Sequence, residues 1–295
     1  MTRRQATATG FVAILLWSML ALFTVGSAPV PPFLLNVLTF GVGGLVGIVW
    51  IMATGGFAQL RGIDWRVYAF GITGLFGYHA LYFSALRLAP PAEAGLICYL
   101  WPLLIVLLSG LMPGERLRAP HIIGALLAFA GTAVLILGKA GAARPEGAMT
   151  GFILAGIAAL AWAGYSVLSR RLGSVPTATV AIFCLGTSVL SIPAHLMVEQ
   201  TLWPTDGLGW ASVLALGLGP VGLAFYVWDV GMKRGDIQVL GTLSYAAPLL
   251  STLALVLAGV EPASPRIALA AALITAGAAL AARASAAPAD RPSCG

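Results

Sequence analysis

The chain contains one six-residue pattern twice, as Tyr99-Leu100-Trp101-Pro102-Leu103-Leu104 and as Tyr245-Ala246-Ala247-Pro248-Leu249-Leu250. The second copy follows the first at an offset of 146 residues, from Tyr99 to Tyr245. At this offset residues 85–134 align with residues 231–280, and three more landmarks coincide: Gly95 with Gly241, Glu115 with Glu261 and Gly131 with Gly277. This repetition predicts two structurally related halves.

Composition places most of the chain in lipid. Hydrophobic residues make up 59% of the 295 residues and charged residues only 9%, whereas a soluble domain carries about 25% charged residues. One aqueous core cannot enclose that much apolar side chain. The net charge is +6, but the positive residues occur singly or in pairs between apolar runs. This distribution is typical of a membrane protein and argues against a nucleic-acid-binding face.

Runs of about 20 apolar residues, long enough to cross a hydrocarbon core of about 30 Å as helices, occur ten times. We therefore predict an all-α integral membrane protein with ten transmembrane helices. Short connections rich in Pro and Gly separate the runs and leave no room for an inserted soluble domain. The first run is longer than the roughly 7–15 residues of a signal-peptide core, so we treat it as a permanent span. The runs cover residues 8–26, 32–54, 66–87, 91–112, 119–138, 149–170, 176–198, 208–230, 237–258 and 264–283.

The distribution of Lys and Arg predicts the orientation of the chain. With the N-terminus in the cytoplasm, inside segments hold 12 of the 16 Lys and Arg residues and outside segments hold 4, which places both termini in the cytoplasm. Five spans per half is an odd number, so the second half enters the membrane from the opposite side and the repeats are inverted. We predict a first repeat over residues 1–140, an inverted repeat over 141–283 and a disordered cytoplasmic tail over 284–295. If the halves exchange two packings, a pathway opens first to one side and then to the other.

The sequence offers none of the chemistry that an enzyme requires. The three cysteines, Cys98, Cys184 and Cys294, are far apart, and no group of His, Cys, Asp and Glu has metal-ligand spacing. It also contains no phosphate-binding loop and no Ser-centred nucleophile elbow. We therefore expect no catalytic residue, no metal and no other cofactor.

Polar and aromatic groups at membrane depth are few, and each is a candidate for binding a solute. Tyr78, His79 and Tyr82 lie on one face of the third predicted helix, where they would either line a cavity or pack. Other deep aromatic residues fit a cavity better than an interfacial belt; these are Trp17, Tyr99, Trp101, Trp162, Tyr165 and Tyr245.

Two prolines at matching positions predict paired helix breaks. Pro102 and Pro248 have no N–H, so the carbonyls of Cys98 and Ser244 lose their helical partners. In lipid such carbonyls must face protein or water. Breaks at corresponding positions of two repeats point to a binding and gating site at the repeat interface, which adds Ser244 and Tyr245 to the candidate cavity residues. The alternative is a pair of structural kinks.

Charged residues near the membrane centre would indicate a charged substrate, and the sequence shows none there. Glu93, Asp229, His195 and Glu199 lie near the ends of predicted spans. No Lys or Arg lies at a depth at which it would neutralise a phosphate. We therefore expect a substrate that is neutral overall and partly aromatic, held by stacked rings, hydroxyls and freed carbonyls.

Residues 8–283, with ten spans in two inverted repeats and prolines in the fourth and ninth spans, resemble the drug/metabolite transporter superfamily in its EamA-type branch. The segment Tyr99-Leu100-Trp101-Pro102, preceded by Tyr78-His79, resembles more narrowly the bacterial aromatic amino acid exporters of that branch. The resemblance implies a central cavity between the halves and export of aromatic amino acids across the bacterial inner membrane. It also implies cavity roles for Tyr78, His79, Tyr82, Tyr99 and Trp101. The first span has no carboxylate, which distinguishes the chain from the small multidrug pumps of the superfamily.

Three functions compete on these observations. The leading hypothesis is alternating-access export of aromatic and other neutral amino acids, and the second is export of another drug-like or sugar metabolite. A membrane-embedded enzyme or sensor is the third, and it lacks both reactive groups and a soluble output domain. The expected partners are a small-molecule substrate and the lipid bilayer, without nucleic acid. A monomer is the simplest assembly, although the sequence leaves the oligomeric state, the driving force and the favoured state open.

Overall fold

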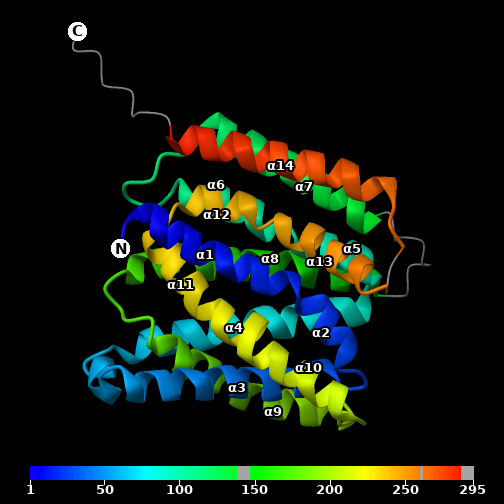
Figure 1. The fold of residues 1–295 in the computed structure, drawn as a ribbon. Coiled ribbons are helices and arrows are strands. Elements are labelled where there is room, and N and C mark those ends of the chain that lie inside the picture. Colours follow the sequence, from blue (N-terminus) through cyan, green and yellow to red (C-terminus); the bar gives the residue numbers. More distant parts are fainter. Residues whose placement is uncertain (138–146, 260–261, 287–295) are drawn as a thin grey trace.

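The computed structural model describes residues 1–137, 147–259 and 262–286, and every regular element in these residues is a helix (Figure 1). In chain order the elements are α1 (Arg3–Ser18), α2 (Leu20–Gly26), α3 (Pro32–Ala53), the 3₁₀ helix η1 (Gly56–Leu60), α4 (Trp65–Leu88), α5 (Pro91–Cys98), α6 (Trp101–Ser109), α7 (Ala119–Leu137), α8 (Ala148–Ser169), the 3₁₀ helix η2 (Arg170–Leu172), α9 (Thr179–Val198), α10 (Gly207–Leu218), the π-helical turn η3 (Gly219–Leu223), α11 (Ala224–Arg234), α12 (Ile237–Leu243), α13 (Ala246–Leu257) and α14 (Pro265–Ala286).

The prediction of an all-α membrane protein is confirmed, and within the described ranges eight helical segments are long and apolar enough to cross a bilayer. Two predicted spans fall outside this set. The span at 66–87 corresponds to α4, which is less apolar because its central part contains His79, three tyrosines and three glycines. The span at 91–112 corresponds to α5 and α6, of which Glu93–Ser109 is a shorter apolar helix. The eight segments are Arg3–Gly26, Pro32–Ala53, Ala119–Leu137, Ala148–Leu172, Thr179–Val198, Gly207–Arg234, Ile237–Leu257 and Pro265–Ala286.

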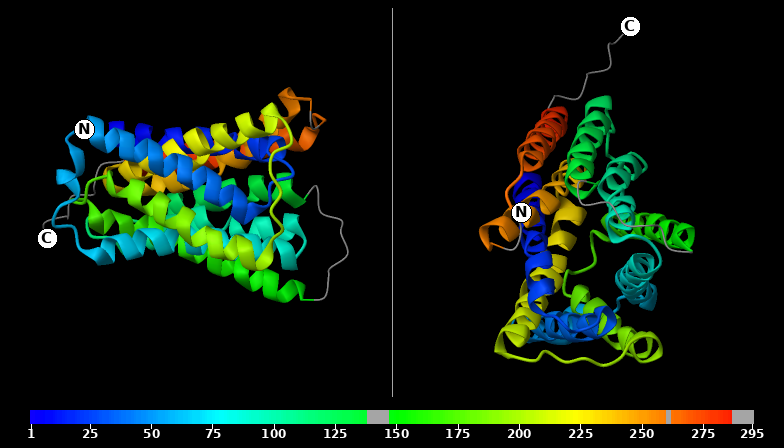
Figure 2. Two further views of the ribbon diagram at one scale, coloured as in Figure 1. Left: turned by 90° about the horizontal axis from the view of Figure 1, so that it is seen from below. Right: turned by 90° about the vertical axis from the view of Figure 1, so that its right-hand side faces the viewer.

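The helices run back and forth along one common direction, and the largest helix–helix contacts join the first half of the chain to the second (Figures 1 and 2). α7 lies beside α14 at one edge of the bundle, and α3 lies beside α9 at the opposite edge. Between these edges α4 packs on α8, and α1 packs on α11. A site in the middle of the bundle is therefore built by both halves.

Four of the membrane helices are interrupted. α1 passes into α2 at Met19, and α5 passes into α6 at Tyr99 and Leu100. The α10–α11 helix contains the π-helical turn η3, and α12 passes into α13 at Ser244 and Tyr245. Three of these breaks contain a proline or have one within the next three residues, because proline cannot donate the backbone hydrogen bond that a continuous helix requires. The sequence predicts the breaks near Pro102 and Pro248; the break at Pro220 is additional.

The C-terminal helix is longer than the sequence indicates. α14 continues to Ala286, so residues 284–286, which the sequence assigns to a disordered tail, are helical. The Arg118 guanidinium donates to the Ala284 carbonyl at 3.0 Å, and the His121 ring lies 3.1 Å from the Ser285 hydroxyl. These contacts and the helix preference of alanine extend the helix. Residues 287–295 and the predicted repeat boundary at 140 lie outside the described residues.

Close glycine contacts fix the helix spacing at three places: Gly10 against Gly231, Gly43 against Gly222 and Gly124 against Gly277. Small residues let helices approach closely where lipid provides no hydrophobic driving force. A Cβ at Gly124 would lie 2.5 Å from the Gly277 carbonyl oxygen, so any side chain there must push α7 and α14 apart.

Replacing Gly124 with alanine is expected to lower the apparent melting temperature of the detergent-solubilised protein by about 5 °C, because overpacking costs roughly 1–3 kcal/mol. Gly164→Ala is the matched control, since a Cβ at Gly164 meets nothing within 4 Å. A thermal unfolding scan of both variants checks this. Equal melting temperatures for the two would mean that the contact does not set the spacing of α7 and α14.

Candidate functional site

Ten aromatic rings from both halves meet in the middle of the bundle, and we call them the central aromatic cluster. Neighbouring rings lie between 5.0 and 6.4 Å apart, centroid to centroid, mostly edge to face or tilted. This geometry is the one that ring quadrupoles favour. The rings come from α1, α3, α4, α6, α8 and α11 and belong to Trp17, Phe40, Tyr78, His79, Tyr82, Trp101, Trp162, Tyr165, Phe225 and Trp228.

Trp17 is the ring that α1 contributes to the cluster. Its ring contacts Trp101, Trp162, Phe225 and Trp228. Its indole N–H donates to the Pro220 carbonyl at 3.0 Å. Because Pro220 lies in the π-helical turn η3, this bond ties the α1 ring to the irregular part of the α10–α11 helix.

Several polar groups of the cluster have no hydrogen-bond partner among the described residues. The indole N–H of Trp228 donates to the Ser166 hydroxyl at 3.1 Å, but those of Trp101 and Trp162 have no hydrogen-bond partner among the described residues. The same holds there for the Tyr82 and Tyr165 hydroxyls. An aromatic surface with free N–H and O–H donors suits a flat apolar group joined to a carboxylate.

His79 supplies an acceptor in the same cluster. Its Nδ1 lies 2.7 Å from the Leu75 carbonyl oxygen, and a carbonyl can only accept, so Nδ1 carries the proton. In the neutral ring Nε2 is then a free acceptor, which suits an ammonium group. The ring is fixed edge-on to Phe40 at 5.0 Å.

Three predicted cavity residues lie outside the central aromatic cluster. Tyr99 is in the turn between α5 and α6, partly exposed and near Tyr78 and Tyr82. Ser244 and Tyr245 lie in the other break, fully buried beside α7 and α14.

The Tyr245 hydroxyl accepts a hydrogen bond from the Leu103 N–H at 3.1 Å, so the repeated tyrosine of one half closes the helix break of the other. The prediction that Pro248 leaves the Ser244 carbonyl without a partner was wrong. The Ala247 N–H donates to it at 3.1 Å in a tighter turn, and the Ser244 hydroxyl donates to the Leu240 carbonyl at 2.7 Å.

Sequence reasoning missed Phe225 and Trp228, although the repeat contained the signal. At the offset of 146, His79 falls on Phe225 and Tyr82 falls on Trp228. Both pairs lie in the cluster, on α4 and on α11. Phe40 has no such partner in the repeat, because the offset leads from Phe40 to Gly186.

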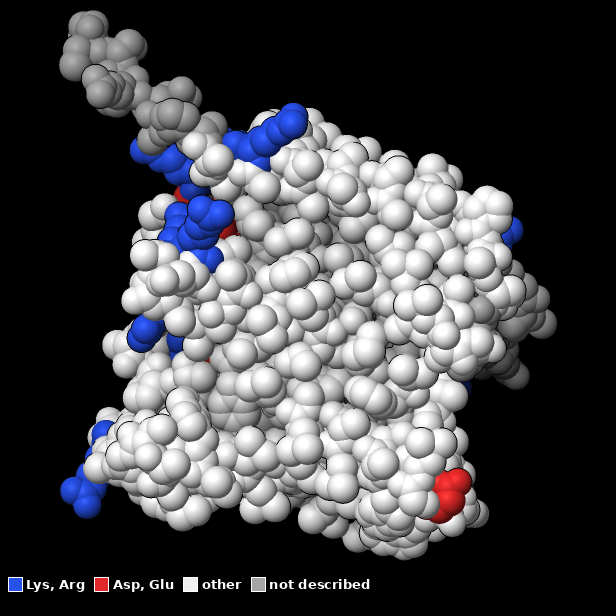
Figure 3. All heavy atoms as spheres, viewed as in Figure 1, with Lys and Arg blue, Asp and Glu red and all other residues white. Residues whose placement is uncertain are grey.

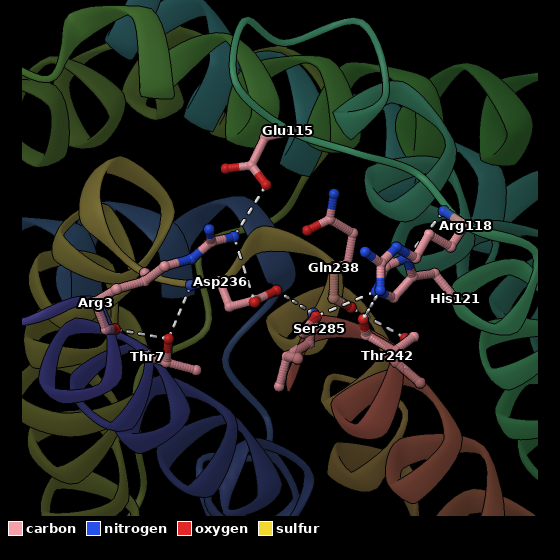
Figure 4. A network of polar contacts seen from close by, with 12 residues as sticks. Arg3, Thr7, Glu115, Arg118, His121, Asp236, Gln238, Thr242 and Ser285 are labelled. Carbon is pink, nitrogen blue, oxygen red and sulfur yellow. Dashed lines mark hydrogen bonds and ion pairs between the residues drawn. The ribbon is translucent and has the colours of Figure 1, made fainter. Parts of the chain in front are cut away.

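An ion-pair network lies at one end of the bundle, the end that carries the N-terminus and most of the Lys and Arg side chains visible in Figure 3; we call it the Arg-rich end. Glu115, with 4% of its side chain exposed, pairs with Arg170 and, at 3.0 Å, with Arg3. Arg3 also lies 3.3 Å from Asp236 (Figure 4). Arg170 donates further to the Met232 and Gly235 carbonyls at 3.0 and 2.9 Å. The network therefore joins α1, η2, the loop after α6, and α11 with the loop that follows it.

A second buried pair lies near the same end. Lys233 Nζ is 2.9 Å from the Asp229 carboxylate, and Asp229 also accepts from the Thr177 hydroxyl at 2.8 Å. Lys233 is a buried cation that the sequence analysis did not single out, with 4% of its side chain exposed, and Asp229 occupies it. Because the ammonium and carboxylate neutralise each other, the pair adds no net charge for a substrate.

At the opposite end of the bundle the Glu199 carboxylate contacts residues of three helices, α3, α4 and α9. Its carboxylate accepts from the N–H groups of Phe33 and Leu34 at the start of α3, at 2.9 and 3.1 Å. It also pairs with Arg87 at the end of α4, at 2.7 Å, and with His195 of α9, at 2.9 Å. A buried carboxylate at a helix N-terminus satisfies unpaired N–H groups and the helix dipole.

An all-helical membrane bundle with an aromatic site between two halves is the form of a solute carrier, and comparison with known families assigns the class. The chain belongs to the EamA-like transporter family, whose model matches residues 6–137 and again residues 149–283. It is therefore a multi-pass membrane protein of a transporter family.

Several individual proteins of known name or structure are similar to this chain over most of its length. The chain is 56% identical, over 95% of its length and 98% of the other protein, to the aromatic amino acid exporter YddG of Ancylobacter novellus. It is 27% identical, over 85% of its length and 88% of the other protein, to the aromatic amino acid exporter YddG of Escherichia coli. A crystal structure of a protein with 55% identity superposes with a TM-score of 0.92, covering 97% of this chain and 99% of the other.

Proposed function

We propose that this protein exports aromatic amino acids, and other neutral amino acids less well, from the cytoplasm across the bacterial inner membrane. The observation that carries the proposal is the central aromatic cluster, which both halves build and which offers free indole N–H groups, hydroxyls and an imidazole acceptor. The two relatives named aromatic amino acid exporters support the same substrate class. The substrate crosses without chemical change, so no catalytic residue or cofactor is required.

The cluster matches the parts of an amino acid zwitterion. The aromatic ring stacks among Trp17, Trp101 and Trp162, where edge-to-face contacts contribute about 0.5–1.5 kcal/mol each beyond burial. The carboxylate accepts from the free N–H groups of Trp101 and Trp162. The ammonium donates to His79 Nε2.

In this proposal the chain forms ten membrane helices in two inverted five-helix repeats, with both termini in the cytoplasm. The double match of the family model, over residues 6–137 and 149–283, supports two repeats. α4 has 24 residues, about 36 Å at 1.5 Å per residue, which is enough to cross the core. The N-terminus and the end of α14 lie at the same, Arg-rich end, as the positive-inside rule requires for cytoplasmic termini.

Transport proceeds by alternating access, with a monomer sufficient because one chain supplies both halves. In this mechanism the ion pairs of Glu115 with Arg3 and Arg170 hold the Arg-rich end closed. Loss of these pairs opens that end to the cytoplasm. The broken helices, α5–α6 and α12–α13, supply the bending points, since a break absorbs backbone rotation at lower cost than a regular helix.

Pro102→Ala and Pro248→Ala should each slow phenylalanine transport by about tenfold while the protein still inserts and folds. Alanine restores an N–H, which lets the helix close across the break and removes the bending point. Rates are measured on vesicles with matched amounts of folded protein. Pro91→Ala at the first position of α5, where proline interrupts no helix, is the control. Wild-type rates in both break variants would reduce the prolines to structural kinks.

The proposed function is tested by export from cells. Cells expressing the chain are loaded with labelled phenylalanine or with a labelled sugar, and the release of each is followed. Faster release of phenylalanine alone is expected. Release of the sugar but not of phenylalanine would favour export of a different metabolite. No change for either in cells that contain the folded protein would contradict the proposal.

A further inference from the structure

A small groove opens on the outer surface of the bundle at the Arg-rich end, and no ring of the central aromatic cluster lines it. It has a volume of about 230 Å³ and lies between the start of α4 and the end of α8. Pockets that enclose a whole small solute measure roughly 300–1,000 Å³, so this groove suits a length of chain better. It is lined by Arg66, Val67 and Phe70 of α4, Leu168 of α8, and Arg171 and Leu172 of η2.

The two arginines of the groove carry unused positive charge. The neighbouring Arg170 points inward to Glu115, whereas Arg171 is exposed. Neither the Arg66 nor the Arg171 guanidinium has an ion pair or side-chain hydrogen bond within the described parts of the chain. The nearby Asp64 carboxylate is engaged in capping α4, accepting from the Arg66 backbone N–H at 2.9 Å. Two guanidinium groups therefore flank an apolar groove and are free to bind an anion.

The position of the groove fixes the kind of anion. Arg66 is the second residue of a 24-residue helix, and Arg171 is the second residue of η2, which directly follows α8. Trp65, next to Arg66, is 70% exposed, as an indole at the headgroup level of a bilayer is. Below the arginines Val67, Phe70 and Leu168 face the same groove. Phe70 is held in place by stacking on Tyr165 at 5.3 Å.

We propose that this groove binds one anionic phospholipid of the surrounding leaflet. Arg66 and Arg171 hold the headgroup phosphate, since guanidinium groups match phosphate oxygens in pairs. The first part of an acyl chain lies against Val67, Phe70, Leu168 and Leu172. The groove is distinct from the substrate site, because no member of the central aromatic cluster lines it, and the two adjoin where Phe70 stacks on Tyr165.

Native mass spectrometry of the full chain in detergent tests this with phosphatidylglycerol as the probe and phosphatidylcholine as the neutral comparison. The wild-type protein is expected to retain one phosphatidylglycerol at least about tenfold better than phosphatidylcholine. The double variant Arg66→Gln/Arg171→Gln should lose this preference. Arg61→Gln/Arg116→Gln, which removes two exposed arginines outside the groove, should keep it.

Two further measurements distinguish binding of the whole lipid from binding of its phosphate alone or of its acyl chain alone. Glycerol 3-phosphate has the phosphate without chains, and it should displace the lipid only at concentrations at least about a hundredfold higher. Leu168→Gln, on the apolar wall, should weaken retention of the lipid about threefold to tenfold. The proposal is overturned if the groove double variant keeps the preference, if both double variants lose it equally, or if glycerol 3-phosphate competes as well as the lipid. Gel filtration of each variant shows that it is folded.

Discussion

Replacing Trp101 with alanine is expected to raise the half-saturating concentration for phenylalanine and tryptophan by at least about thirtyfold. Trp101 is 6% exposed, and its ring centroid lies 6.2 Å from Trp17, 6.3 Å from Trp162 and 6.0 Å from Trp228. The substitution removes a stacking surface worth about 0.5–1.5 kcal/mol. It also removes an N–H that bonds a carboxylate, worth about 1.5–3 kcal/mol.

The loss of stacking and the loss of the hydrogen bond can be distinguished by comparing substrates with and without a ring. Alanine and threonine have no ring, so they should lose only the hydrogen bond, and the preference for aromatic substrates should fall by about tenfold. Trp101→Phe keeps a ring without the N–H, so it should weaken all substrates and preserve the preference. Trp210→Ala, in the exposed Trp203–Trp210 pair near the Glu199 end, is the control. Equal loss for all four substrates in Trp101→Ala would point to a folding defect.

Replacing Glu115 with glutamine is expected to open the Arg-rich end. The substitution removes the partner of both Arg3 and Arg170 while it keeps the shape of the side chain. Breaking a buried pair costs about 3–5 kcal/mol, and this cost falls only on the closed state. Even a fraction of it moves the equilibrium toward the open state by more than about tenfold.

A buried reporter residue measures this opening. Ser109, the last residue of α6, is 0% exposed, so a cysteine there reacts slowly with a membrane-impermeant thiol reagent while the Arg-rich end is closed. In a background with Cys98, Cys184 and Cys294 replaced by serine, Glu115→Gln should speed labelling at least about tenfold. Glu199→Gln changes an equally buried carboxylate at the other end and should leave the rate unchanged. Unchanged labelling in Glu115→Gln would refute a gating role for the network.

The sequence predicts the membrane-helix class and much of the cluster because both depend on local signals. Apolar runs of membrane length define the helices. Few polar or aromatic groups lie at membrane depth, so Trp17, Trp101 and Trp162 are recognisable as candidates for binding a solute. Phe225 and Trp228 have no such mark within their own helix. Only the repeat relates them to His79 and Tyr82, because equivalent helix faces of two repeats meet at one centre.

Contacts between distant residues are the part that the sequence does not predict. Tyr99 and Tyr245 are identical in the repeat, yet the Tyr245 hydroxyl is occupied by Leu103 N–H, whereas the Tyr99 hydroxyl has no hydrogen-bond partner among the described residues. Glu115 is a landmark of the repeat without an evident role in sequence, because its partner Arg3 is 112 residues away. Such pairings depend on how whole helices pack, and residue type and spacing do not determine them.

Uptake by purified protein in liposomes tests most directly whether the central aromatic cluster is the site of an amino acid carrier. Labelled phenylalanine, tryptophan, alanine and threonine are compared, with and without an imposed proton gradient, for the wild type, Trp101→Ala and Trp210→Ala. The account predicts saturable uptake that favours the aromatic pair, is lost in Trp101→Ala and persists in Trp210→Ala. The comparison with and without the proton gradient shows whether protons drive the uptake. No uptake of any of the four by folded protein, or aromatic uptake that survives Trp101→Ala unchanged, would contradict it.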